Sequence, residues 1–234
     1  MGTDGACYFE NGGRDGFPEE TGGDSMSQII LDFGSGNTCK NDIKYVERMI
    51  DELKAVDTGK HEVIIKWQLF TDAPPNERLN WITFGHAYNY AKERGYKTTA
   101  SVFDKDCLDF LLTFDIPFVK IANRPDLYWL AGEVPRKIPV YVSMGGIKSK
   151  YDCGLWDSDI TLACVSKYPA LVRDYEKLFN AIWLASAVSD HTTDYHLWHK
   201  YSPAFIEWHY KLEDSTGLDA GEFARTPKQL EGIL

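Results

Sequence analysis

Two histidines that close short apolar runs are the residues best suited to do chemistry together. His191 stands near the end of the run Val188–Thr192, and His209 ends the run Phe205–His209. If both runs are neighbouring parallel strands, which lie about 4.8 Å apart, the two imidazoles leave the same end of the sheet. Imidazole is a common metal ligand, so the pair predicts one shared metal ion. Taken singly, each histidine fits a structural role equally well.

Charged and amide side chains occur within other expected strands or at their ends. They are Asp32, Lys66, Gln68, Lys120 and Glu207. Residues two apart share one face of a strand, as Lys66 and Gln68 do, and so do Glu207 and His209. A charge inside a barrel is costly unless it faces a site. Each could alone be an exposed charge on an edge strand, but together they predict a site at the carboxyl ends of the strands.

Small polar residues complete this set. Ser101, Asn123, Ser143 and Ser189 fall at the ends of the third, fourth, fifth and seventh expected strands. With two lysines, these hydroxyls and amides form a cradle for a small anion bearing phosphate and carboxylate. A metal ion beside that cradle could polarise a carbonyl. The residues therefore predict a metal-assisted reaction of a small phosphorylated acid, without naming the acid.

Short β-branched or aromatic runs alternate with helical patterns along the chain, which is typical of parallel sheets built from βα units. The expected strands are Ile29–Phe33, Val63–Leu69, Thr98–Ser101, Phe118–Ala122, Val140–Ser143, Ile160–Cys164, Trp183–Val188 and Phe205–Tyr210. The expected helices are Asp42–Ala55, Trp81–Arg94, Lys105–Phe114 and Val172–Asn180. Between Ser143 and Ile160 no helical period occurs, so a loop replaces one helix. These elements predict an α/β fold, a (β/α)₈ TIM barrel with abbreviated helices.

The chain of 234 residues is expected to form a loop-rich lead-in over residues 1–27 and one barrel domain over residues 28–234. With 25 basic and 35 acidic residues its formal charge is −10, which repels nucleic acids and anionic membranes. No apolar run is long enough to span a membrane and no signal segment is evident, so we expect a cytoplasmic protein. The 5 cysteines are odd in number and form no close pair, which argues against a disulfide frame or a zinc knuckle.

The order of motifs resembles the barrel domain of the N-acetylneuraminate (sialic acid) synthase family. The motifs are IIKWQLF, TTASVFD, FVKIAN, VYVSMG, LACVSKYPA, VSDHT and FIEWHYKL, spread from about Ile29 to the C-terminus. SKYPA followed by SDHT and IEWH is the most specific part. The resemblance implies a (β/α)₈ barrel that condenses phosphoenolpyruvate with an amino sugar or another aldehyde, releases phosphate and forms a nonulosonic acid. It also implies a divalent metal, Mn²⁺ or Mg²⁺.

The resemblance also implies roles for individual residues. The metal ligands would be His191 and His209; the residues that bind phosphoenolpyruvate would be Lys66, Ser101, Lys120, Ser143 and Ser189; and the acceptor side would be lined by Gln68, Tyr168 and Glu207. Asn123 stands where the family has a serine, and we include it among the substrate-binding residues. Asp32 stands where the family has a glutamate suited to acid–base work, so Asp32 or Glu207 would handle the protons.

Several departures from the family affect the acceptor half. The usual Asn-His-Asn-Gly after the acidic residue is here Gly36–Cys39, and two further family histidines are Ala163 and Ala220, the latter after Asp219. The chain ends at Leu234, so no C-terminal antifreeze-like domain is expected. A homodimer, a separate chain or the loop Gly145–Asp159 would then complete the acceptor site.

Two alternatives stay open. One is a related synthase of the 3-deoxy-sugar-acid type that uses phosphoenolpyruvate with an acceptor other than a sialic acid precursor. The other is a catalytically silent barrel that binds a ligand or a partner protein, which the change to Asp32 and the lost histidines would suit. The retained lysines and the two histidines favour an enzyme.

Overall fold

The computed structural model describes residues 26–72, 74–146, 155, 158–182 and 186–234. The predicted lead-in therefore lies outside the described residues, apart from its last two positions. The same holds for most of the loop Gly145–Asp159 and for Cys7 and Cys153. No helix within the described ranges is both long and apolar enough to cross a membrane.

Eight parallel strands close into a barrel in the order β1-β2-β3-β4-β5-β6-β7-β8, so the predicted (β/α)₈ fold is confirmed. The strands are β1 Gln28–Asp32, β2 Glu62–Leu69, β3 Lys97–Val102, β4 Val119–Ile121, β5 Val140–Met144, β6 Ile160–Cys164, β7 Ala187–Asp190 and β8 Phe205–His209. In sequence order, every strand pairs with the next, and β8 pairs with β1.

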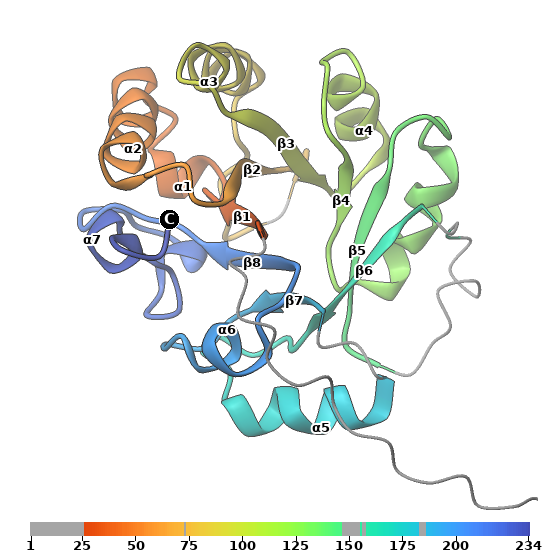
Figure 1. The fold of residues 1–234 in the computed structure, drawn as a ribbon. Helices are drawn as coiled ribbons and strands as arrows, with labels where there is room; N and C mark the ends of the chain where they lie inside the picture. Colours follow the sequence, from red (N-terminus) through yellow and green to blue (C-terminus); the bar gives the residue numbers. More distant parts are fainter. Residues whose placement is uncertain (1–25, 73, 147–154, 156–157, 183–185) are drawn as a thin grey trace, which may run out of the picture.

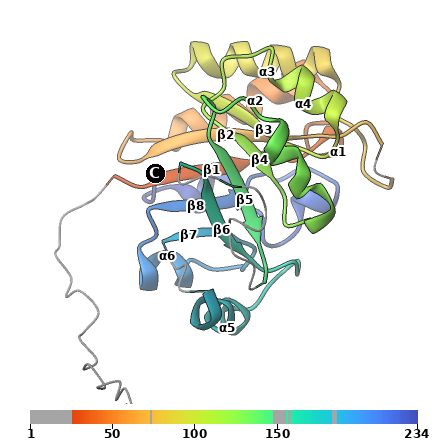
Figure 2. The ribbon, with the colours of Figure 1, turned by 90° about the vertical axis from the view of Figure 1, so that its right-hand side faces the viewer.

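Helices surround the barrel on the outside, as Figures 1 and 2 show. They are α1 Gly36–Cys39, α2 Ile43–Val56, α3 Trp81–Glu93, α4 Lys105–Leu111, α5 Val172–Ile182, α6 His196–Tyr201 and α7 Pro227–Leu230. Two 3₁₀ segments, η1 Pro125–Glu133 and η3 Leu218–Ala220, add to this layer. α4 and α6 span only 7 and 6 residues, so the expectation of abbreviated helices holds.

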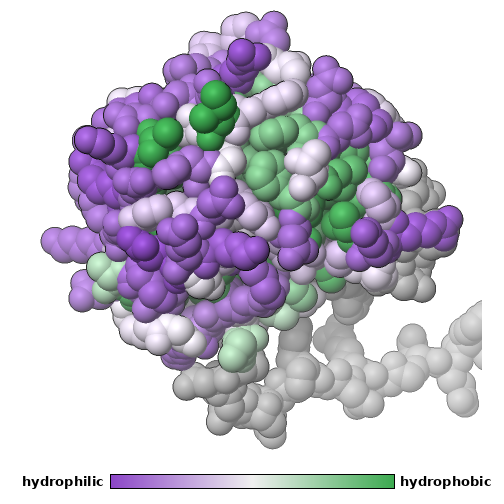
Figure 3. All heavy atoms as spheres, turned by 90° about the horizontal axis from the view of Figure 1, so that it is seen from above, coloured by the Kyte–Doolittle hydropathy of each residue, from purple (hydrophilic) through white to green (hydrophobic). Residues whose placement is uncertain are grey.

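The sequence of α2 shows why these helices form and how they pack. Asp42 caps its N-terminus by accepting from the backbone N–H groups of Lys44 and Tyr45. Its apolar residues recur at helical spacing and are buried, with Val46, Met49, Ile50 and Leu53 on the inner face. Figure 3 shows the molecule from above, with a hydrophilic surface that is interrupted by a hydrophobic patch.

The seventh strand differs from the prediction. We expected it at Trp183–Val188, but β7 begins at Ala187 and continues to Asp190. Ser189 and Asp190 therefore belong to the strand, and both are buried because β8 pairs with them. Ser189 lies beside Glu207 in register, and Asp190 accepts a 2.9 Å hydrogen bond from the indole N–H of Trp208. Residues 183–185 lie outside the description.

Inside the barrel, apolar and polar layers lie one above the other. The lower layer is a buried cluster formed by Ile30, Ile64, Phe118, Tyr141, Leu162 and Ala187. The rings of Phe118 and Tyr141 stack at 3.9 Å. Residues two positions later on the same strands point inward again and are almost all polar. The apolar layer thus closes the bottom of the barrel, and the polar layer above it forms the floor of a cavity.

Candidate active site

All twelve residues predicted for the site line one cavity at the carboxyl ends of the strands. They are Asp32, Lys66, Gln68, Ser101, Lys120, Asn123, Ser143, Tyr168, Ser189, His191, Glu207 and His209. The cavity has a volume of about 640 Å³ and opens to solvent. Closure of the barrel brings them together, because they come from seven of the eight strands and from the loops after β4, β6 and β7.

Lys66 is buried beneath this cavity between two carboxylates. Its ammonium lies 2.6 Å from Asp32 Oδ2 and 3.8 Å from Glu207 Oε2, and it donates to Ser101 Oγ at 2.9 Å. Burial alone would lower the pKa of Lys66, but the two carboxylates outweigh that effect and raise the pKa above its ordinary value. Lys66 is therefore a fixed cation.

Lys120 is equally buried but less well paired. It donates to Ser143 Oγ at 2.7 Å, and its nearest carboxylate oxygen, Glu207 Oε2, lies 3.5 Å away. Burial lowers the pKa of Lys120, and repulsion from Lys66 adds to this, while Glu207 only partly offsets them. An incoming anion would therefore gain most from Lys120, whose charge is the less compensated of the two.

The two carboxylates are held ionised by these lysines. Asp32 accepts from Gly34 N at 2.9 Å and from Gln68 Nε2 at 2.9 Å, in addition to its ion pair with Lys66. Burial would raise the pKa of Asp32, but Lys66 and His209 lower it well below its ordinary range. The pKa of Glu207 is lowered in the same way: burial opposes ionisation, and the charges of Lys120 and Lys66 overcome it.

His191 and His209 lie side by side, as predicted, with their ring centroids 5.4 Å apart. His191 Nδ1 is 2.8 Å from the backbone oxygen of Val165. Because a carbonyl only accepts, Nδ1 carries the proton and Nε2 carries the lone pair, which lies 3.4 Å from Ser189 Oγ. Burial lowers the pKa of His191 to about 3, so the imidazole is neutral at pH 7. This is the form that binds metals.

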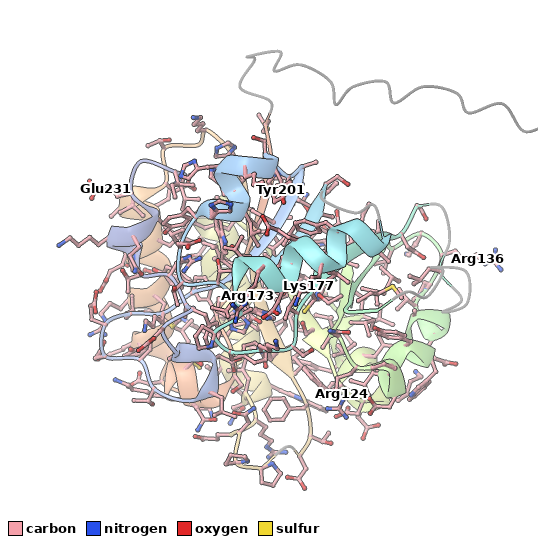
Figure 4. The ribbon with its side chains drawn as sticks, turned by 90° about the horizontal axis from the view of Figure 1, so that it is seen from below. Arg124, Arg136, Arg173, Lys177, Tyr201 and Glu231 are labelled. Atoms are coloured by element: carbon pink, nitrogen blue, oxygen red, sulfur yellow. The ribbon has the colours of Figure 1, made fainter. Side chains whose placement is uncertain are left out.

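α5 fixes the backbone at His191. The hydroxyl of its buried Tyr175 donates to Ser189 O at 2.6 Å and accepts from His191 N at 3.0 Å. Figure 4, a view from below, shows the neighbouring basic residues Arg173 and Lys177 on α5 near the centre of the picture. The amphipathic helix thus buries the residue that supports the site and exposes its charges.

Aromatic rings form the wall beside the histidine pair. The ring of Tyr168 lies 4.3 Å from that of His191, and the ring of Phe223 lies 4.9 Å from that of His209. Tyr168 is 55% exposed, whereas Phe223 is 3% exposed. This wall offers an apolar surface next to the imidazoles, on the open side of the cavity.

Asp219 and Phe223 are among the lining residues of this cavity that the sequence did not predict. In the sequence Asp219 stood out only as the residue before Ala220, yet it is buried, and its Oδ1 lies 3.4 Å from His209 Nδ1 and 2.9 Å from Gln68 Nε2. Burial raises its pKa above the ordinary value. Both residues stand in or near η3, where no strand or helix period marks them, so no local signal identifies them.

A metal ion at the two histidines would need ligand atoms that are not already taken up in hydrogen bonds. Three buried atoms in the cavity have no hydrogen-bond partner: Glu207 Oε2, His209 Nδ1 and Asp219 Oδ2. Across the described ranges, no group of three or more His, Cys, Asp or Glu side chains is placed to hold a metal. The residues thus fit an ion that takes two imidazole nitrogens from the protein and its remaining ligands from elsewhere.

Comparisons of the whole chain add three similar structures. No family model and no curated protein sequence matches it. The N-acetylneuraminic acid (sialic acid) synthetase of Leptospira borgpetersenii is 21% identical, with a TM-score of 0.71 over 90% of this chain and 82% of that chain. The spore coat polysaccharide biosynthesis protein E of Chromobacterium violaceum is 16% identical, with a TM-score of 0.68 over 88% of this chain and 72% of that chain.

A truncated 3-deoxy-D-arabino-heptulosonate 7-phosphate synthase of Thermotoga maritima is more distant. It is 10% identical, with a TM-score of 0.58 over 89% of this chain and 83% of that chain. At these identities the similarities establish a shared barrel fold. They leave the chemistry to be argued from the site.

Proposed function

We propose that the protein condenses phosphoenolpyruvate with a small aldehyde, an amino sugar or a related sugar, and releases phosphate. The observation that carries this proposal is the convergence of two buried lysines and two buried imidazoles in one cavity. A buried lysine is costly unless its charge serves a purpose. Two of them, lined with serine hydroxyls, suit a ligand with separate phosphate and carboxylate groups.

The names of the similar structures support the same class of reaction. Two of them are synthases of sugar acids, and the first, at a TM-score of 0.71, is a sialic acid synthetase. The motifs that resemble the sialic acid synthase family supply eleven of the predicted site residues, and these eleven and Asp32 all line the cavity. A sialic-acid-like nonulosonic acid is therefore our first choice of product.

In the proposed reaction, C3 of phosphoenolpyruvate forms a bond to the aldehyde carbon, and the aldehyde oxygen takes up a proton. Water then adds to C2 and loses a proton, and the C–O bond to phosphate breaks. Lys66 and Lys120 would neutralise the phosphate and carboxylate, an electrostatic effect that the buried floor of the cavity strengthens. Asp32 or Glu207, both held ionised, would accept the proton that the added water loses.

We also propose that His191 and His209 hold a divalent metal ion, Mn²⁺ or Mg²⁺. When bound, the ion would polarise the aldehyde carbonyl. The chain's own contribution is to present two imidazoles from adjacent strand ends, with His191 kept neutral by burial. The aromatic wall formed by Tyr168 and Phe223 would position the acceptor over this pair and limit the access of water.

The test is a phosphate-release assay with phosphoenolpyruvate, Mn²⁺ and a panel of aldehydes that includes N-acetylmannosamine. Calorimetric titration of the metal-free protein, first with Mn²⁺ and then with phosphoenolpyruvate, measures the two binding steps. We expect metal-dependent binding of phosphoenolpyruvate that His209→Ala loses. Absence of both binding steps would refute the proposal and favour a silent barrel.

A second candidate keeps phosphoenolpyruvate but changes the acceptor. Asn123 differs from the family's serine, and its amide donates to Ser166 Oγ at 2.9 Å and to Cys164 O at 3.2 Å, where Ala163 replaces a family histidine. These changes alter the acceptor half and leave the lysines in place. Phosphate release with a short phosphorylated aldehyde but not with amino sugars would favour a 3-deoxy-sugar-acid type of synthase.

A further inference from the structure

The two imidazoles of the cavity are held by different kinds of group. His191 donates its Nδ1 proton to a backbone carbonyl, that of Val165, at 2.8 Å. His209 Nδ1 is buried without a hydrogen-bond partner, and the carboxylate oxygen Asp219 Oδ1 lies 3.4 Å away. A buried donor without a partner costs about 1–3 kcal/mol of stability. A hydrogen bond from His209 Nδ1 to Asp219 Oδ1, formed if the two atoms approach by a few tenths of an ångström, would remove this cost.

Asp219 is itself fixed in place. The amide nitrogen of Gln68 donates to Asp219 Oδ1 and to Asp32 Oδ2, at 2.9 Å in each case. The loop that carries Asp219 packs closely on the first strand's loop, because a Cβ added at Gly34 would lie 2.9 Å from the Asp219 Cβ. The carboxylate is therefore presented to the His209 ring by a rigid support.

The other nitrogen of the same ring, Nε2, lies near a weaker hydrogen-bond acceptor. His209 Nε2 lies 3.8 Å from Asp32 Oδ2, but that oxygen already accepts from Gln68 and is neutralised by Lys66 at 2.6 Å. Asp219 has no lysine within ion-pair distance among the described residues, and its Oδ2 has no hydrogen-bond partner. The tautomer with its proton on Nδ1 is therefore favoured, because the opposite tautomer would set a nitrogen lone pair against the Asp219 carboxylate.

We propose that Asp219 is a positioning residue that keeps the proton of His209 on Nδ1, so that Nε2 presents its lone pair to the metal ion. This inference rests on the proposed function. Both imidazoles would then direct Nδ1–H at an oxygen and carry the lone pair on Nε2, which in His191 lies 3.4 Å from Ser189 Oγ. A carboxylate behind a metal-binding histidine fixes the ring's orientation and raises its basicity as a ligand.

The first test needs no metal. The ¹⁵N shifts of the histidine rings in the metal-free protein report which nitrogen carries the proton, and loss of one signal set in His209→Gln assigns His209. We expect the Nδ1–H form in the wild type and a shift toward the Nε2–H form in Asp219→Ala. Asp219→Asn, which has the same shape and retains an accepting oxygen, should keep most of the Nδ1–H form.

The second test measures Mn²⁺ affinity by calorimetry. Loss of an outer carboxylate lowers metal affinity by about 10–100-fold, which we expect for Asp219→Ala, with a smaller loss for Asp219→Asn. The control is Asp51→Ala, which removes a carboxylate on α2 that pairs with Arg94 away from the cavity and should leave affinity unchanged. Circular dichroism confirms folding of each variant.

The outcomes separate this inference from the proposed function. A wild-type His209 in the Nε2–H form, or a tautomer that Asp219→Ala leaves unchanged, would overturn the positioning role. Complete loss of Mn²⁺ binding with an unchanged tautomer would make Asp219 a direct ligand and overturn it as well. A wild type that binds no Mn²⁺ but shows the expected tautomer shift would refute the metal site while supporting the contact.

Discussion

Glu207 shares its charge between two buried lysines, so the variant Glu207→Gln tests the electrostatics of the cavity. Glutamine has the same shape and its oxygen can still accept from Ser189 Oγ, which lies 2.9 Å from Glu207 Oε1. The lost charge affects the two lysines unequally. Lys66 keeps its 2.6 Å ion pair with Asp32, whereas the only carboxylate within 4 Å of Lys120 among the described residues is Glu207.

The variant leaves Lys120 as a buried cation without a counterion. Removing one partner of a buried ion pair costs about 3–5 kcal/mol. We expect the lower limit, about 3 kcal/mol, because Ser143 still accepts from Lys120 at 2.7 Å. For a domain of this size, that loss lowers Tm by roughly 6–12 °C.

The sign of the pH dependence follows from Lys120. Its pKa is already lowered in the folded state by burial, and Glu207→Gln lowers it further. Between the folded and unfolded pKa values the unfolded chain binds more protons, so stability rises with pH in that window. The difference between variant and wild type should therefore shrink from pH 7 toward pH 10.

Urea denaturation followed by tryptophan fluorescence at pH 7 and pH 9 measures both effects. The matched control is Glu176→Gln, which breaks an exposed 2.6 Å ion pair with Lys200 and should leave the midpoint unchanged. The double variant Lys120→Met/Glu207→Gln should recover most of the lost stability, because no unpaired charge remains. A loss below about 1 kcal/mol at pH 7 in the single variant would refute the buried ion pair.

Three further predictions concern the same cavity. His191→Ala and His209→Ala should each abolish Mn²⁺ binding in calorimetry while the circular dichroism spectrum stays unchanged; full metal affinity in both variants would contradict the two-histidine site. Gly34→Ala should destabilise the protein by more than about 1 kcal/mol in urea, because its φ of 74° strains any other residue; unchanged stability would rule this strain out. Asp32 and Glu207 have pKa values in the folded state below their ordinary ones. The stability that they contribute should therefore be complete above about pH 5 and be lost as pH falls through the folded pKa values. A Tm that does not change from pH 6 to pH 2 would count against their ion pairs.

The cavity combines strong electrostatics with a rigid frame. Its floor rests on an apolar layer in which Phe118 and Tyr141 stack. Above that layer, the carboxylates of Asp32, Glu207 and Asp219 and the cations of Lys66, Lys120 and Arg124 line the cavity. The proposed metal ion would add positive charge for a phosphorylated acid.

The sequence by itself determined the fold class and the membership of the predicted site. Alternation of apolar and polar residues with period two placed Lys66 with Gln68, and Glu207 with His209, on one strand face each. Parallel strands bring their carboxyl ends to one rim, so residues at those ends converge once the barrel is recognised. This is why the twelve predicted residues line a single cavity.

Only the tertiary structure decided which groups pair and how far β7 extends. The strand was predicted to end at Val188, and pairing of Ser189 and Asp190 with β8, together with the indole of Trp208, extends it and makes their burial favourable. Asp219 lies in a loop with no periodic pattern, and its contact with His209 depends on how that loop folds back over the barrel. The period of apolar and polar residues predicts which way a side chain points along a strand or helix. Contacts between loops depend instead on the packing of segments far apart in the chain.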